Sequence, residues 1–197
     1  MHSVLTASSQ NVGDRSILPQ PWLAAWSTAQ VGVEPTGLRP YFWNSISMVV
    51  PAVAISTVLG ALNGYVLTKW RFRYDTILFG LMLFACFIPF QIVLIPMAAV
   101  LGVLGLAGST PGLVLVHVVY GIGFSTLYFR NYYAVFPTEL VRAAQIDGAG
   151  FFRIFWRILL PSSGPIAVVC VIWQFTNIWN DFLFGASFAS GSGAPMT

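Results

Sequence analysis

The chain has 197 residues, of which only 8% are charged and 57% are hydrophobic. Soluble domains carry about 25% charged residues, so this composition excludes an ordinary soluble domain. The formal net charge of +3 comes from scattered Arg residues and one Lys without a basic run, so no nucleic-acid partner is indicated.

Long stretches of the chain contain no Asp, Glu, Lys or Arg. They lie between Arg39 and Lys69, between Asp75 and Arg130, and between Arg157 and Asp181. A helix that spans a bilayer needs about 20 mostly apolar residues, and these stretches have room for four such helices. A soluble helical protein would need charged helix faces, which are absent here. The sequence therefore predicts an all-α membrane protein, a polytopic helical bundle.

The predicted spans follow a polar N-terminal segment. Residues 1–43 contain neither an apolar run long enough to span a bilayer nor the pattern of a signal peptide. A transmembrane domain is expected over residues 44–190, and residues 191–197 form a Gly/Ser/Pro-containing tail. The four spans are predicted at residues 44–67, 76–101, 111–132 and 163–188.

The distribution of Lys and Arg predicts the orientation of the chain, because loops rich in these residues stay in the cytoplasm. Residues 68–75 contain three of them and residues 130–161 contain four, whereas residues 102–110 contain none. We therefore expect 68–75 and 130–161 to be cytoplasmic, and the N-terminal segment, 102–110 and the tail to be extracytoplasmic. The polar N-terminal segment would then have to cross the membrane without a preceding helix, which predicts that an upstream helix is missing.

Two patterns inside the predicted spans concern helix packing and helix shape. Ser56, Gly60 and Gly64 are spaced four apart, and small residues at this spacing allow two helix backbones to approach closely. Pro89 and Pro96 remove backbone donors from the second span, so we expect that span to be kinked.

Polar residues in two spans are candidates for lining a translocation pathway. Kinked helices tend to line cavities, and Gln91 lies beside the first expected kink; hydrogen bonding between helices is its alternative role. In the fourth span, Gln174, Asn177 and Asp181 share one helical face, and Asn180 lies near it. Such a stripe is expected to face the bundle or a wet pathway, unless Asp181 lies at the outer membrane interface, where its cost is small.

The sequence contains no pattern that indicates a metal site, a cofactor or catalysis. No second His, Cys or carboxylate is spaced to complete a metal site with His117, which is expected to hydrogen-bond between helices. Within the spans, His117 and Asp181 form the only ionisable pair, and their spacing suggests no mechanism for a membrane-embedded enzyme. A GxxxxGK[ST] phosphate loop is absent, so we do not expect this chain to hydrolyse ATP.

The stretch over residues 136–161 is the only long one that is both charged and helical in pattern. It includes ELVRAAQIDGAGFFRIFWRILLP, from Glu139 to Pro161. A helix should begin near Thr138, with Glu139 at its positive end, and should end at Gly148. A second short helix should run from about Phe151 and stop at Pro161. The segment is either a docking element for another protein or an interfacial amphipathic hairpin.

This segment resembles the EAA loop of ABC importer permeases, whose pattern is Glu-Ala-Ala, three residues, Gly, nine residues, Ile-x-Leu-Pro. Arg142 replaces the Glu of the pattern, which affects the electrostatic contact usual at that position. The resemblance implies that the loop couples the chain to an ATPase. The implied coupling residues are Glu139, Arg142, Ala143, Ala144, Asp147, Gly148, Ile158, Leu160 and Pro161.

Other stretches resemble the carbohydrate subgroup of these permeases, with glucose/mannose-type permeases closest. They are RPYFWNSISMVVPAV, LNGYVLTKWRF, FIPFQIVLIPM and IWNDFLFG, which extend the resemblance over most of residues 38–190. The resemblance implies the type I importer permease fold with six spanning helices. This chain matches the second to the fifth, so we expect it to be truncated at both ends.

The resemblance also implies a function and a set of partners. The chain would form half of the translocation pathway for a sugar across the bacterial inner membrane. Its partners would be a cytoplasmic ABC ATPase dimer, a second permease subunit, an extracytoplasmic sugar-binding protein and the lipid bilayer. A permease for another small solute such as glycerol phosphate, and an inactive remnant, stay open as alternatives. No span holds Arg or Lys centrally, which favours a neutral sugar.

Overall fold

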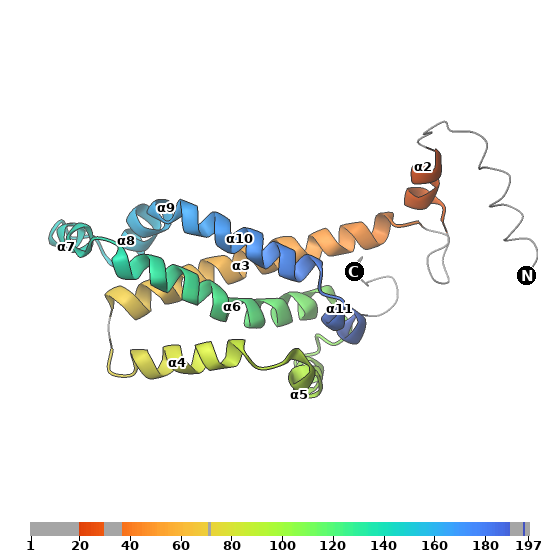
Figure 1. Ribbon diagram of the computed structural model, residues 1–197, viewed down its shortest axis with the longest axis horizontal. Coiled ribbons are helices and arrows are strands. Elements are labelled where there is room, and N and C mark those ends of the chain that lie inside the picture. Colours follow the sequence, from red (N-terminus) through yellow and green to blue (C-terminus); the bar gives the residue numbers. More distant parts are fainter. Residues whose placement is uncertain (1–19, 30–36, 71, 190–194, 196–197) are drawn as a thin grey trace, which may run out of the picture. The chain divides into compact units, whose positions relative to one another are not determined.

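The computed structural model describes residues 20–29, 37–70, 72–189 and 195. Every secondary-structure element in this part of the chain is a helix (Figure 1). The all-α prediction is therefore confirmed. The chain divides into one unit over residues 1–40 and another over residues 41–197. The first unit contains α2 (Gln20–Ser27), a helix that the sequence did not lead us to expect.

Within the described residues, two helices are long and apolar enough to cross a membrane unbroken. They are α3 (Arg39–Lys69) and α6 (Thr110–Val135), which cover the predicted spans 44–67 and 111–132. At 1.5 Å per residue they are about 46 and 39 Å long, which exceeds a hydrocarbon core of about 30 Å. The first turn of α6 is capped by the Ser109 hydroxyl, which accepts a hydrogen bond from the backbone N–H of Gly112.

The second predicted span, 76–101, is broken rather than kinked. It consists of α4 (Asp75–Cys86) and α5 (Phe90–Val103), whose axes differ by 105°. Pro89 has no N–H and disfavours the helical conformation of Ile88, so one helix ends and another begins here. Pro96 lies inside α5 without ending it. The departure from a straight helix that Pro89 predicts is therefore a break between two helices, whereas the kink expected at Pro96 does not interrupt α5.

The fourth predicted span, 163–188, is also divided. The prediction of a single helix over these residues is therefore wrong. It consists of α10 (Gly164–Trp179) and α11 (Leu183–Phe188). Between them, a carboxylate oxygen of Asp181 accepts a hydrogen bond from the backbone N–H of Phe184 at 3.1 Å. This bond satisfies one of the free donors at the start of α11, as an N-terminal cap does.

The segment between α6 and α10 contains two helical parts joined at Gly148, as predicted. The first is α7 (Thr138–Ile146), which Gly148 ends with a φ of +77°. The N–H groups of Gly148 and Ala149 bond to the carbonyls of Gln145 and Ala144, the hydrogen-bond pattern of a Schellman motif.

The second helical part ends at Ser162, one residue after the proline that was predicted to stop it. Its parts are α8 (Phe151–Ile154), the π-helix η1 (Phe155–Leu159) and α9 (Leu160–Ser162). A wider π turn directly before Pro161 accommodates a residue that cannot donate the usual backbone bond. The chain bends by 79° between this part and α10.

Close packing of α3 on α6 forms the centre of the second unit. A Cβ on Gly60 would overlap Ser125, and a Cβ on Gly64 would overlap Phe129 and the backbone of Arg130. The prediction that the small-residue stripe of α3 allows close helix packing is therefore confirmed.

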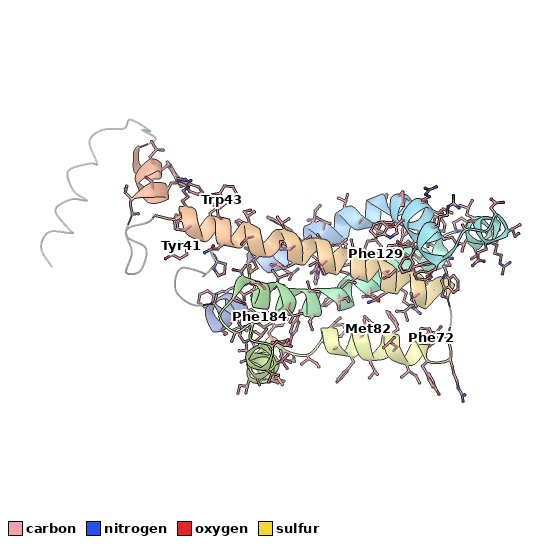
Figure 2. All side chains as sticks on the ribbon, turned by 180° about the vertical axis from the view of Figure 1, so that it is seen from behind. Tyr41, Trp43, Phe72, Met82, Phe129 and Phe184 are labelled. Atoms are coloured by element: carbon pink, nitrogen blue, oxygen red, sulfur yellow. The ribbon has the colours of Figure 1, made fainter. Side chains whose placement is uncertain are left out.

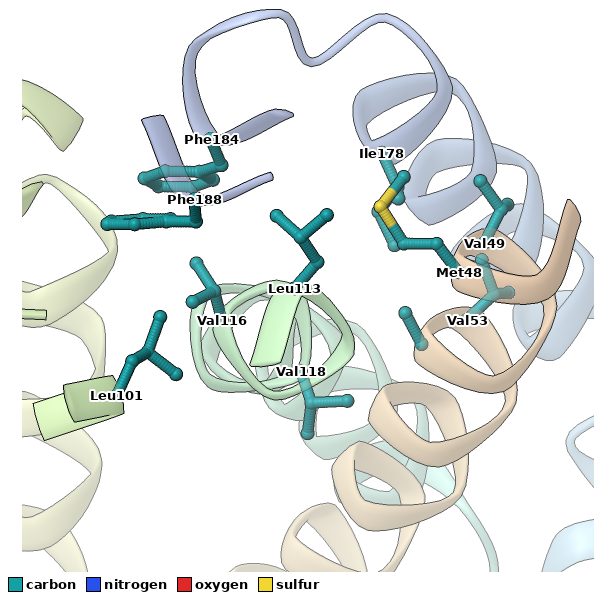
Figure 3. Packing of buried hydrophobic residues seen from close by; sticks show 11 residues of the cluster. Met48, Val49, Val53, Leu101, Leu113, Val116, Val118, Ile178, Phe184 and Phe188 are labelled. Atoms are coloured by element: carbon teal, nitrogen blue, oxygen red, sulfur yellow. The ribbon is translucent and has the colours of Figure 1, made fainter. Parts of the chain in front are cut away.

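Two apolar clusters hold the helices together. The first joins α3, α5, α6, α10 and α11; in Figure 3, Leu113 and Val116 of α6 lie between Met48 of α3 and Phe184 of α11. The second joins α3, α6 and α10 to the segment α7–η1 and includes Tyr65 and Phe129. Figure 2 shows Phe184 and Phe129 toward opposite ends of the helices, so each end of the bundle has its own core.

The packing of α3 on α6 predicts that Gly64→Ala destabilises the protein. Adding a methyl group at this crowded contact should cost about 1–3 kcal/mol. Thermal unfolding in detergent micelles measures the change. The matched control is Gly80→Ala in α4, where a Cβ meets nothing within 4 Å, so helix propensity should leave stability unchanged or higher by up to about 1 kcal/mol. Equal losses in both variants would contradict the packing argument.

Candidate functional site

A pocket of about 490 Å³ lies between α6 and α10, at the points where the two broken spans change direction. Its lining includes residues from α4, α5, α6, α10, the α10–α11 connection and α11. Four of the five predicted pathway residues line it: Gln174, Asn177, Asn180 and Asp181. Gln91 is exposed on α5 and is not part of this lining, so the structure does not bring it to the other four.

Gln174 is a buried polar residue in the lining of the pocket. Its side-chain Nε2 donates a hydrogen bond to the hydroxyl of Ser56 on α3 at 2.7 Å. Gly121 makes room for this amide, because a Cβ there would overlap it. The position of Gln174 is therefore determined by α3 and α6 together, and only its helix periodicity was visible in the sequence.

Asn177 and Asn180 are exposed on the pocket wall. Each donates one side-chain hydrogen bond at 2.8 Å to a backbone carbonyl four residues earlier in the chain. A carboxamide has two N–H donors and one acceptor oxygen. Both residues therefore keep hydrogen-bonding capacity for a ligand in the pocket.

His117 and Asp181 meet in the pocket although 64 residues separate them. The distance from Nε2 of His117 to Oδ2 of Asp181 is 3.6 Å, and their side chains are 5% and 14% exposed. This distance is too long for a hydrogen bond, so the expected hydrogen bond from His117 to another helix is not present at this atom. In the described part of the chain, no group of three or more His, Cys, Asp or Glu residues could hold a metal ion.

Five aromatic residues also line the pocket, which the sequence pattern did not predict. Ring centroids of Phe90, Tyr120 and Phe184 lie 5.0 to 5.5 Å apart, and those of Phe124 and Trp173 lie 4.6 Å apart. The only signal in the sequence was that these aromatic residues flank the polar ones on the same helices. A lining that combines aromatic rings with amides and a carboxylate suits a ligand that has both apolar faces and hydrogen-bonding groups.

The predicted coupling residues all lie in the segment α7–α9, which forms a second candidate site. Exposed members are Glu139, Arg142, Ala143, Asp147, Gly148 and Pro161, and half-buried members are Ala144, Ile158 and Leu160. Large apolar side chains are exposed beside them: Leu140 at 52%, Ile146 at 86% and Phe152 at 66%. Such a mixture of exposed apolar and charged side chains is typical of a surface that contacts another protein.

The fold is similar to that of a solved membrane transporter. The match is to the crystal structure of a bacterial ABC transporter involved in the import of the acidic polysaccharide alginate, with a TM-score of 0.69 and 20% sequence identity. It covers 78% of this chain and 54% of the other chain.

Curated relatives have permease names. The chain is 45% identical over 136 residues to a probable ABC transporter permease of Pyrococcus horikoshii, covering 68% of this chain and 50% of the relative. It is 36% identical over 172 residues to a xylose/arabinose import permease of Haloferax volcanii, covering 78% and 56%. A diacetylchitobiose uptake permease of Streptomyces coelicolor is 31% identical, covering 84% and 54%.

The chain thus spans about half the length of the curated relatives that it matches. Residues 56–197 match the family described as binding-protein-dependent transport system inner membrane component. Together with its bilayer-length apolar helices, this match shows that the chain belongs to that family of multi-pass inner-membrane permeases.

Proposed function

We propose that this chain forms half of the translocation pathway of an ATP-driven ABC importer for a sugar. The observation that carries the proposal is the pocket between α6 and α10, whose lining combines aromatic rings with amide groups and one carboxylate. A sugar ring has C–H faces that pack on aromatic rings and hydroxyl groups that bond to amides and carboxylates. The import of sugars by the named relatives supports the same substrate class.

A neutral substrate fits this pocket better than a phosphorylated one. No Arg or Lys is among the described residues that line it, and its carboxylate lies beside His117 and the N–H of Phe184. An anionic phosphate would normally be met by Arg or Lys. Glucose and mannose are the first sugars to test, because several stretches of the chain resemble permeases of that type.

We also propose that α7–α9 is cytoplasmic and binds the ATPase subunit of the importer. The exposed apolar and charged side chains of this segment support this role, as does its resemblance to the EAA loop. A second permease subunit and an extracytoplasmic sugar-binding protein complete the proposed importer. The family description, which names binding-protein-dependent transport, supports the latter partner.

The proposed pathway predicts that Asn177→Leu slows sugar uptake. The change removes the hydrogen-bonding amide at similar volume, and losing about 1–2 kcal/mol corresponds to a roughly 5- to 30-fold lower rate at subsaturating sugar. Uptake of labelled glucose, mannose, xylose and glycerol 3-phosphate is measured in vesicles that contain the assembled importer. The control is Ile172→Ala, an exposed position on α10 outside the pocket lining. Uptake of glycerol 3-phosphate without any sugar would refute the neutral-sugar proposal.

The proposed ATPase contact predicts a difference between two substitutions of Gly148. Gly148→Val should weaken association strongly, because a β-branched residue at a φ of +77° costs about 1–2 kcal/mol or more and disturbs the end of α7. Gly148→Asn should retain most of the association, since Asn tolerates this conformation. Co-purification with the ATPase measures both. If the Val variant co-purifies as well as the unmodified chain, the contact does not depend on this turn.

A further inference from the structure

The last residue of α3 contacts the start of the coupling segment α7–α9. The Lys69 ammonium group donates hydrogen bonds to the carbonyl of Phe136 at 2.8 Å and to the hydroxyl of Thr138 at 3.2 Å. Phe136 is the C-cap residue that follows α6, and Thr138 begins α7. One side chain of α3 therefore joins the junction between these two helices, where a cation also satisfies a free carbonyl at a helix C-terminus.

An aromatic contact links α3 to the second part of the coupling segment. The Tyr65 ring stacks on Phe151 of α8 and Phe155 of η1, with centroids 4.8 and 6.0 Å apart. Trp70 donates a 2.6 Å hydrogen bond from its indole N–H to the Tyr65 hydroxyl, and its ring contacts Phe151 edge-on. Because Tyr65 and Phe155 are almost completely buried, this contact restrains α8 relative to α3.

The same helix reaches the pocket through Ser56, which accepts the hydrogen bond from Gln174. Ser56 lies thirteen residues before Lys69, which corresponds to about 20 Å along an α-helix. Between these positions α3 is packed tightly on α6 at Gly60 and Gly64. One helix therefore connects the coupling segment with a residue of the pocket.

We propose that Lys69 and Tyr65 are positioning residues through which α3 transmits displacement of the coupling segment to the pocket. α6 and α10 flank the segment along the chain, and the turn between α7 and α8 is open, because a Cβ added at Gly148 or Gly150 would meet nothing within 4 Å. The contacts of Lys69 and Tyr65 hold both helical parts against α3, and Val141 of α7 packs in the same buried cluster as Tyr65. This proposal rests on the proposed importer function, because it concerns how the ATPase contact reaches the transport pathway.

The test uses the complete importer with Lys69→Met and Lys69→Arg. Co-purification with the ATPase, sugar-stimulated ATP hydrolysis and sugar uptake are measured for each variant. We expect Lys69→Met to co-purify normally but to lower uptake per ATP hydrolysed by roughly 2- to 30-fold, the range of known coupling changes. Lys69→Arg keeps a charged donor and should restore most of that ratio.

A matched control disturbs the anchoring of the segment to α6 instead. The Tyr132 hydroxyl donates a 2.6 Å hydrogen bond to the carbonyl of Ser162, and Tyr132→Phe removes only this bond. Its uptake per ATP should stay close to that of the unmodified importer. If Lys69→Met does not assemble, Thr138→Val removes one acceptor of the Lys69 ammonium group and is expected to lower the ratio in the same direction.

The outcomes separate this proposal from the proposed function. An unmodified chain that neither associates with the ATPase nor supports uptake overturns the importer function itself. In another outcome, the unmodified importer works while Lys69→Met and Thr138→Val both show the same uptake per ATP hydrolysed as the unmodified chain. That result overturns the role of α3 and leaves the importer function standing. Equal decreases in Tyr132→Phe and Lys69→Met would also overturn it, because a general loss of segment structure would then explain both. A double-mutant cycle of Lys69→Met with Ser56→Ala should be non-additive, and additive effects would contradict a connection along α3.

Discussion

The close approach of α3 and α6 is the contact on which the rest of the structure depends. Lipid provides no hydrophobic force between apolar helices, so association depends on packing and on hydrogen bonds between them. Gly60 and Gly64 bring the two backbones together. Buried polar contacts hold α10 against α3 and α6. The Cys170 thiol donates to the Ser125 hydroxyl at 3.2 Å, and Gln174 donates to Ser56 at 2.7 Å. These contacts determine where the polar face of α10 lies.

Two broken spans place the pocket beside this packed centre. Interrupted helices at membrane depth are tolerated where their free backbone groups are buried in protein or line a cavity. Pro89 interrupts the second span by removing a donor, whereas Asp181 follows the end of α10 and caps α11. The Asp181 carboxylate therefore has two roles, because it begins a helix and also lies beside His117 in the pocket. A group that would be costly in lipid is satisfied by the break that it helps to form.

The arrangement of α3 also connects the two candidate sites. Its middle part bonds to the pocket at Ser56, and its last turn holds α7 and α8 through Lys69 and Tyr65. Close packing on α6 at Gly60 and Gly64 resists local bending of α3 between these two contacts. In the proposed importer, these contacts make α3 the helix that would respond to the segment that binds the ATPase.

Much of this protein was predictable from its sequence. Composition and charge-free stretches indicate membrane helices, and single Gly or Pro residues affect the backbone only within a few residues of their own positions. These local features predicted the all-α class, the positions of α3 and α6, the interruption of the second span at Pro89 and the turn at Gly148. The EAA-like spacing identified the segment α7–α9. The prediction from hydropathy extended the fourth helix through Asn180 and Asp181, because hydropathy does not detect a side chain that caps a new helix. Only the tertiary structure brought Asp181 to His117, Lys69 to Phe136 and the aromatic rings to the amides, and left Gln91 outside. Those partners lie on different helices, and their distances depend on how the helices pack.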